Sequence, residues 1–278
     1  MIGRVLVVAG SDSGGGAGLQ ADVKTITALG GYAATAVTAL TAQNTLGVHR
    51  IVPVEPEFVE EQMRVVLEDL GADVIKTGML ASVAVVRAVA RAAARWAPGV
   101  PLVVDPVMIA KGGAPLLAGD AVQAVLDELV PRAALLTPNA PEASALTGVR
   151  VQEPDDLGRA AEQLLLRGAG AALVKGGHLE GDTIVDVLRT ADGDEERFTS
   201  ERVLTLSTHG TGCTLASAIA VGLAQGLTLR HAVARAHGYV RRAIETAPGW
   251  GQGHGPLNHA HPLEPRPGSA QGTREALH

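Results

Sequence analysis

The chain has 278 residues, of which 46% are hydrophobic and only 2% aromatic, and its formal net charge is −6. A core of Ala, Val, Leu and Ile suits helices packed on a parallel sheet. A negative charge without a long basic run argues against nucleic acid as the main partner. The single cysteine excludes an internal disulfide and fits a reducing cytoplasm.

Short apolar runs alternate with helical patterns from one end of the chain to the other. The predicted strands are 4–9, 33–40, 74–77, 102–105, 133–137 and 171–175. The predicted helices are 16–29, 56–70, 82–96, 120–129, 154–167, 211–225 and 229–247. This alternation predicts an α/β fold with three layers, in which helices cover both faces of a mostly parallel sheet.

Three other features define the organisation of the chain. Segments 183–188 and 197–205 predict a small antiparallel hairpin at one edge of the sheet. Segment 203–229 lacks charged residues but contains His209 and four glycines, so it is interpreted as a strand, a loop and a buried helix rather than a membrane span. No linker interrupts residues 1–263, which predicts a single domain, and the Pro- and Gly-rich residues 264–278 are expected to be disordered.

Chemistry-bearing residues cluster at the ends of the predicted strands. Open α/β sheets bind ligands outside the carboxyl ends of their strands. In chain order these residues are the glycine loop 10–18, Gln43 and Asn44, 76–79, Asp105 and Lys111, Asn139 and Glu142, 175–178, and Cys213. Seven loops therefore converge on one edge, which packing alone does not explain.

The first of these loops, residues 10–18, contains five glycines in nine residues. Its glycines do not match the G-x-G-x-x-G dinucleotide fingerprint, and the chain has no Gly-Lys pair and hence no Walker A motif. A flexible turn is one interpretation. We favour a backbone that must approach a small ligand closely, because so many glycines are costly in a simple turn.

The single cysteine closes the run His209-Gly210-Thr211-Gly212-Cys213 at the start of a long apolar helix. The first amides of a helix lack internal partners and attract anions. A thiol at this position is expected to have a lowered pKa. The run therefore predicts an anion cradle beside a proton acceptor, and a buried, inert cysteine is the competing interpretation.

Five further residues allow both a structural and a functional interpretation. Asn139 and Glu142, three residues apart at a helix start, suit a helix cap or two oxygen ligands for Mg²⁺ equally well. Lys175 suits a solvated turn or the neutralisation of phosphates. Gln43 can be a polar loop residue or can pair with a heteroaromatic ring, and Met79 can fill the core or flank such a ring. Together they predict a phosphoryl-transfer site without a P-loop.

Eight segments give the chain a specific resemblance to hydroxymethylpyrimidine/phosphomethylpyrimidine kinases of thiamine biosynthesis, within the ribokinase-like superfamily. They run in order along nearly the whole chain: 9–24 (AGSDSGGGAGLQADVK), 38–48 (TALTAQNTLGV), 76–80 (KTGML), 105–112 (DPVMIAKG), 137–142 (TPNAPE), 175–178 (KGGH), 208–215 (THGTGCTL) and 253–259 (GHGPLNH). The resemblance implies MgATP-dependent phosphorylation of 4-amino-5-hydroxymethyl-2-methylpyrimidine, then of its monophosphate. It also implies a ribokinase-like fold and a homodimer.

The resemblance also implies roles for individual residues. Gln43 would hydrogen-bond the aminopyrimidine, while Asp22, Met79 and Val107 would shape its pocket. Cys213 would be the base for the substrate hydroxymethyl group. The anion hole would be formed by Gly210, Thr211 and Gly212.

On the nucleotide side, the resemblance implies that Asn139 and Glu142 position Mg²⁺ and that Lys175 contacts the phosphates of ATP. Two alternatives remain open. A pyridoxal or pyridoxine kinase of the same fold needs a different ring pocket, and Gln43 and Cys213 favour the pyrimidine. A module that senses phosphorylated pyrimidine without turnover would not need the complete set of cradle, Lys175 and Asn139–Glu142.

Overall fold

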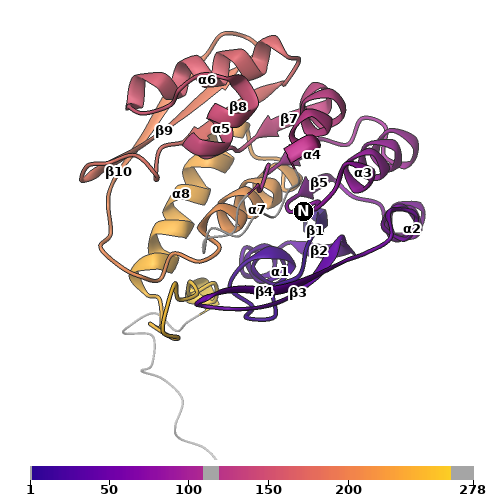
Figure 1. Ribbon diagram of the computed structural model, residues 1–278, viewed down its shortest axis with the longest axis horizontal. Coiled ribbons are helices and arrows are strands. Elements are labelled where there is room, and N and C mark those ends of the chain that lie inside the picture. The colour runs from indigo at the N-terminus through magenta and orange to yellow at the C-terminus, as the bar shows by residue number, and fades with distance from the viewer. Residues whose placement is uncertain (1, 109–118, 264–278) are drawn as a thin grey trace, which may run out of the picture.

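The computed structural model describes residues 2–108 and 119–263 (Figure 1). Lys111 and the tail predicted to be disordered, 264–278, lie outside these residues. A sheet of eight strands in the order β10-β9-β8-β7-β6-β5-β1-β2 forms the centre of the molecule. Its strands are β1 (Arg4–Ala9), β2 (Tyr32–Val37), β5 (Val74–Thr77), β6 (Leu102–Val104), β7 (Ala133–Leu136), β8 (Ala171–Lys175), β9 (Thr183–Thr190) and β10 (Glu195–Glu201).

Helices cover both faces of this sheet, which confirms the predicted three-layer α/β fold. One face carries α1 (Gly18–Ala28), α7 (Thr211–Ala224) and α8 (Leu229–Glu245). The other carries α2 (Pro56–Asp69), α3 (Val83–Trp96), α4 (Gly119–Ala124), α5 (Ala140–Thr147) and α6 (Pro154–Leu166).

The strands are apolar on both sides because each side faces a helical layer. In β1, Val5 and Val7 pack in the α1–α7–α8 layer, whereas Leu6 and Val8 pack on the opposite face. All four side chains are at most 1% exposed. This two-sided burial gives the near-continuous hydrophobic runs from which the parallel sheet was predicted.

The antiparallel edge was also predicted correctly. Strands β9 and β10 pair antiparallel, and β9 pairs antiparallel with β8, while the remaining neighbours in the sheet are parallel. The strands of the hairpin end at residues 190 and 201, so they differ by a few residues from the predicted bounds. Helix 120–129 was predicted as one element, but α4 passes into a π-helical turn, Val125–Leu129, and a 3₁₀ turn, Val130–Arg132.

The predicted strand 33–40 is in fact two strands in different sheets. Strand β2 ends at Val37, and β3 (Ala39–Asn44) pairs antiparallel with β4 (Gly47–Pro53) in a separate two-stranded sheet. Thr38 lies at the break, where its hydroxyl donates to the carbonyl of Met79 at 2.6 Å. The alternation of side chains does not reveal this change of sheet, because both strands are extended.

The order of the strands fixes where a ligand can enter. The chain passes from β1 to its neighbour β2 on one side and later to β5 on the other, so the loops after β1 and β5 diverge. A crevice forms at such a switch point in an open α/β sheet. Gly10 and Met79 meet there: a Cβ added to Gly10 would lie 3.0 Å from the Met79 sulfur.

In the described part of the chain, no helix combines the length and apolarity needed to cross a membrane.

Candidate active site

The first glycine loop packs directly against the N-terminus of α7. Gly210 caps this helix with a φ of 82°, and a Cβ added to it would lie only 1.9 Å from the carbonyl oxygen of Gly16. Gly18 has a φ of 53°, and a Cβ there would lie 2.4 Å from the carbonyl oxygen of Gly10. Glycine is therefore required at Gly210 and Gly18 both by the left-handed backbone and by the close approach.

Asp12 holds this glycine loop in shape. Its carboxylate is fully buried and accepts hydrogen bonds from the backbone N–H groups of Gly14, Gly16 and Ala17. It also lies 2.8 Å from Nε2 of His209. Burial opposes the charge, but the bonds to His209 and to the backbone lower the pKa of Asp12. This role of Asp12 was not predicted from the sequence, although a lone acidic residue within a glycine loop was an available signal.

Cys213 lies in the first turn of α7, as predicted, but the predicted lowering of its pKa is wrong. Burial raises the pKa of the Cys213 thiol to about 12. The charge of Lys76 and a hydrogen bond from the backbone N–H of Gly18 act in the opposite direction, whereas Asp22 and Asp105 raise the pKa further. The desolvation of the thiolate therefore exceeds the stabilisation it gains from its surroundings.

Asp22 lies beneath the site instead of on its surface. Its side chain is 0% exposed, as is that of Lys76, whose Nζ is 2.9 Å from both carboxylate oxygens of Asp22. Ser217 of α7 donates a hydrogen bond of 2.7 Å to the same carboxylate. The resemblance implied that Asp22 shapes a ring pocket. Because Asp22 is buried in this structure, it can do so only through the residues that it contacts.

A second charged group lies beside the anion cradle. Lys175, at the end of β8, places Nζ 3.2 Å from Oδ1 of Asp105, which also accepts a hydrogen bond from the hydroxyl of Thr137. A Cβ added to Gly212 would be 3.3 Å from the Lys175 Nζ and 3.9 Å from Oδ2 of Asp105. Burial opposes the charge on Lys175, but Asp105 and Glu142 outweigh it and raise the pKa of Lys175. The ammonium group and the carboxylate, which contact each other, thus lie close beside the cradle.

Asn139 and Glu142 form a reciprocal helix cap at the start of α5. Oδ1 of Asn139 accepts from the backbone N–H of Glu142, and Oε2 of Glu142 accepts from the backbone N–H of Asn139. The structural interpretation of this pair is confirmed. Burial, the largest effect, and the charge of Asp105 raise the pKa of Glu142 to about 7, although Lys175 opposes them.

The charge of Asp105 raises the pKa of Glu142 because the two carboxylates repel each other. This repulsion is the observation that favours Mg²⁺ binding beside these residues. Oxygen donors are the ligands that Mg²⁺ prefers, and a divalent cation would relieve the repulsion between the two carboxylates. Within residues 2–108 and 119–263, no group of three or more His, Cys, Asp or Glu side chains is arranged to hold a metal ion. Mg²⁺ at this position would therefore depend on other oxygens, such as those of phosphates and water.

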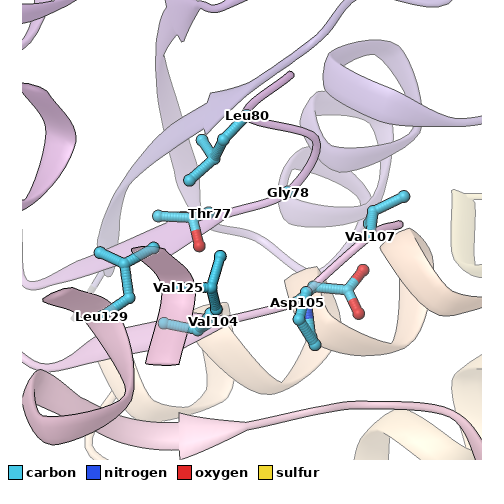
Figure 2. A pocket seen from close by; sticks show the side chains of 9 residues that line it. Thr77, Gly78, Leu80, Val104, Asp105, Val107, Val125 and Leu129 are labelled. Atoms are coloured by element: carbon cyan, nitrogen blue, oxygen red, sulfur yellow. The ribbon is translucent and has the colours of Figure 1, made fainter. Parts of the chain in front are cut away.

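The residues predicted to contact the ring come from three different segments of the chain. Gln43 belongs to β3, at a bulge in its pairing with β4, and its backbone N–H and carbonyl both bond the hydroxyl of Ser13. Met79 is 8% exposed beside Gly10. Val107 follows β6, close to Asp105, as Figure 2 shows.

Figure 2 also shows a small cavity between the ends of β5 and β6. Its volume of about 10 Å³ is at the lower limit for one water molecule. The hydroxyl of Thr77 lines it and is buried without a hydrogen-bond partner among the residues that the structure describes. A water molecule there would satisfy this hydroxyl, but a pyrimidine ring would not fit.

The segment near the C-terminus closes the site from the side of β3 and β4. The backbone N–H of His254 donates to the carbonyl of Thr45 at the β3–β4 turn. His209 bridges to Pro256, and Nε2 of His259 lies 3.0 Å from the hydroxyl of Thr214, the residue after Cys213. The 253–259 motif therefore connects the β3–β4 hairpin to the first turn of α7.

Comparison with known proteins agrees with this geometry. The family model for phosphomethylpyrimidine kinase matches residues 12–258. The chain is 51% identical over 258 residues to the thiamine biosynthesis bifunctional protein ThiED of Geobacter sulfurreducens, covering 92% of this chain but only 52% of that longer protein. It is 44% identical to the hydroxymethylpyrimidine/phosphomethylpyrimidine kinase of Bacillus subtilis, over 92% of this chain and 94% of that protein.

Solved structures of related kinases support the same family and fold. A phosphomethylpyrimidine kinase from Clostridium difficile superposes with a TM-score of 0.77 at 38% identity, covering 87% of this chain and 99% of that one. A pyridoxal kinase from Bacillus subtilis, solved as an ADP complex, superposes with a TM-score of 0.86 at 32% identity, covering 95% of this chain and all of that one. The fold is thus that of the ribokinase-like kinases, as predicted. The chain belongs to the phosphomethylpyrimidine kinase family.

Proposed function

We propose that this protein uses ATP to phosphorylate 4-amino-5-hydroxymethyl-2-methylpyrimidine, and then phosphorylates the monophosphate to the diphosphate, in thiamine biosynthesis. The observation that carries the proposal is the family match over residues 12–258, which includes the cradle and its lysine. The rival sensing module is less favoured, because a sensor would not need the cradle, Lys175 and the Asn139–Glu142 pair together.

Phosphoryl transfer depends mainly on positioning and on the neutralisation of charge. In this proposal the first amides of α7, from Gly210, Thr211 and Gly212, hold the migrating phosphoryl group. Lys175 neutralises the phosphates of ATP, and its position against Gly212 supports that role. Mg²⁺, when bound, would supply further positive charge to the phosphates, and Asn139 and Glu142 would hold it.

Cys213 is proposed to accept the proton of the substrate hydroxymethyl group. Only a thiolate can accept it, and burial opposes the thiolate, so the reactive form depends on nearby positive charge, above all that of Lys76. The second phosphorylation needs this base less, since the attacking oxygen belongs to a phosphate that is already anionic.

The pyrimidine ring is proposed to lie at the switch point between β1 and β5. The amide of Gln43 offers one donor and one acceptor, which suits an aminopyrimidine edge. Met79 and Val107 would contact the ring faces, and Asp22 would act on the pocket through Lys76. Two further proposals are a cytoplasmic location, supported by the single cysteine, and a homodimer.

A coupled ADP-release assay tests the function directly. The panel contains the hydroxymethylpyrimidine, its monophosphate, pyridoxal and pyridoxine, each with MgATP. We expect turnover of both pyrimidines and a lower kcat/KM for the pyridines. Pyridoxal belongs in the panel because pyridoxal kinases superpose with TM-scores of 0.85–0.86. Preference for pyridoxal would contradict the proposed substrate, and binding without ADP release would favour a sensing module.

A further inference from the structure

Helices α1 and α7 contact each other at two positions near Cys213, one helical turn apart. Gly18 and Asp22 are four residues apart on α1, and Cys213 and Ser217 are four residues apart on α7. Residues with this spacing share one face of a helix. The backbone N–H of Gly18 bonds the Cys213 thiol, and one turn further along Ser217 donates to Asp22. The carboxylate is therefore held one helical turn from the thiol.

Lys76 reaches this pair from the sheet below. It is paired in register with Val7 of β1 and Val103 of β6, whose side chains pack in the layer of α1 and α7. Its side chain is 0% exposed, and its Nζ is 2.9 Å from both oxygens of Asp22. The ammonium group thus lies under the helix N-terminus that carries Cys213.

The energetics of such a pair argue against a purely structural role. Taking two charges out of water costs several kcal/mol per ion, and well-packed apolar residues often replace a buried ion pair without loss of stability. Lys76 and Asp22 lie among the apolar residues of this layer, where a Leu–Met pair would pack without that cost. A buried ion pair next to a reactive thiol is therefore a candidate for tuning the thiol.

Four charged groups act on Cys213 from the elements around it. Lys76 of β5 favours the thiolate, and so does Lys175 of β8. Asp22 of α1 and Asp105, which follows β6, oppose it. Lys76 makes the largest favourable contribution. The ionisation of Cys213 therefore depends on how strongly Asp22 compensates the charge of Lys76.

We propose that Lys76 is a positioning residue whose buried ammonium group, held by the carboxylate of Asp22, stabilises the thiolate of Cys213. The use of that thiolate as a base rests on the proposed function, but its formation does not. Two predictions of opposite sign follow. Removing the lysine charge disfavours the thiolate, whereas removing the Asp22 charge leaves the lysine uncompensated and favours it.

The single cysteine makes this proposal directly measurable in the full-length protein. The probe is iodoacetamide, and the rate of alkylation is followed by intact mass between pH 7 and 9.5. We expect Lys76→Met to slow alkylation at every pH and Asp22→Asn to accelerate it. A change of one pKa unit alters the rate roughly three- to fourfold, because a less basic thiolate is also less nucleophilic.

Opposite changes in the alkylation rate distinguish electrostatic tuning from loosening of the core. Loosening would expose the thiol and accelerate alkylation in both variants. Absorbance of the thiolate near 240 nm, titrated up to about pH 11 where the thiolate becomes a measurable fraction and with Cys213→Ser as the spectral blank, provides a readout that does not depend on reagent access. Equal rates, or changes in the same direction for both variants, would overturn the proposal.

Lys76→Met leaves the Asp22 carboxylate buried and unpaired, so thermal melts accompany the measurements. If this variant does not fold, Asp22→Asn decides alone: faster alkylation and higher thiolate absorbance support the proposal, and unchanged values overturn it. ADP release is assayed separately. Opposite shifts without ADP release would contradict the proposed kinase function alone, whereas ADP release without shifts would contradict only the role of Lys76.

Discussion

At the residue scale, Cys213 shows how two local effects compete. A helix N-terminus and a neighbouring lysine favour a thiolate, but the half-buried thiol has lost much of the water that would solvate a negative charge. Burial raises the pKa of the thiol to about 12, so the protein at neutral pH holds mostly the thiol. A base in this state acts only through its minor thiolate population, and the groups that change this population control the proposed first reaction.

Replacing Cys213 with alanine tests this dependence. We expect Cys213→Ala to reduce kcat for the first phosphorylation by roughly 10²- to 10⁴-fold, the usual contribution of a general base. The second phosphorylation should fall far less, because its nucleophile is already ionised. Separate steady-state assays of the two steps give the comparison. Equal losses would show that the thiol does not serve as the base.

Glu142 predicts a pH dependence on the nucleotide side. Because its pKa is raised to about 7, the carboxylate population decreases below pH 7 and metal-dependent binding weakens as the pH falls. We expect the affinity for MgATP, measured by calorimetry, to decrease by up to tenfold between pH 7 and 6, since each pH unit below the pKa removes about tenfold of the ionised form.

Glu142→Gln is the matched variant, because glutamine also serves as the partner in a capping box and preserves the start of α5. Its affinity for MgATP should be weaker at pH 8 and nearly independent of pH. A variant that retains the wild-type pH profile would assign the titration to another group.

The position of Lys175 predicts that its removal changes the apparent KM for ATP and not that for the pyrimidine. Lys175→Ala removes the ammonium group beside Gly212, so the apparent KM for ATP should rise by tenfold or more while that for the pyrimidine changes little. Arg91→Ala, which removes a surface cation on α3 paired with Glu60, is the matched charge control. An unchanged KM for ATP would contradict the proposed contact.

At the element scale, the ends of helices and strands decide the shape of the site. The Asn139–Glu142 cap begins α5, and Gly148 ends it in the left-handed conformation with a φ of 78°. Both signals are local, and the start of this helix was predicted from the Asn139–Glu142 spacing. The division of 33–40 into β2 and β3 was not predicted, because it depends on the contact of Thr38 with Met79, which is 41 residues away.

The C-terminal segment predicts a pH dependence of stability. Burial lowers the pKa of His259 to about 4, so this imidazole stays neutral beside Thr214 while the unfolded chain takes up a proton below about pH 6.5. Its contribution to the free energy of unfolding is therefore present above pH 6.5 and is lost as the pH falls toward 4. The loss amounts to at most about 3 kcal/mol.

Denaturant unfolding at several pH values checks this prediction. Replacing His259 with glutamine removes the titrating group, so the variant should lose less stability than the wild type between pH 6.5 and 4. Its stability at pH 7 is expected to be lower, because the contact with Thr214 is altered. An identical slope in both proteins would contradict a role of His259 in acid sensitivity.

At the scale of the whole molecule, the β3–β4 hairpin projects apolar side chains away from the core. Leu40 and Val52 face each other across this hairpin and are 53% and 45% exposed. Tyr32, on the edge strand β2, is 50% exposed. Two-stranded hairpins are marginally stable alone, and exposed apolar clusters often mark contact surfaces, which supports the proposed homodimer.

Light scattering after size exclusion tests the assembly. We expect the mass of a dimer, about twice 28.4 kDa. The double substitution Leu40→Lys and Val52→Glu should shift the protein toward a monomer, whereas Leu166→Lys, at an exposed apolar position on α6, should not. A monomeric wild type would rule out the homodimer, and a dimer that survives the double substitution would place its interface elsewhere.

The sequence by itself determined most of the elements, their order and the candidate residues of the site, because these depend on local chemistry. Apolar periodicity predicts a strand or a helix from a few neighbours, and the convergence of polar residues at strand ends follows from a parallel sheet. Positions such as Lys175, Asn139 and Glu142 were found in this way.

Only the tertiary structure decided how these groups are charged and which of them are paired. Asp12 meets His209 across 197 residues, and Lys76 meets Asp22 across 54. The pKa of Cys213 was predicted in the wrong direction for the same reason. A helix terminus is visible in five residues of sequence, but desolvation is the sum of all atoms that the fold brings around a group, and no local pattern contains it.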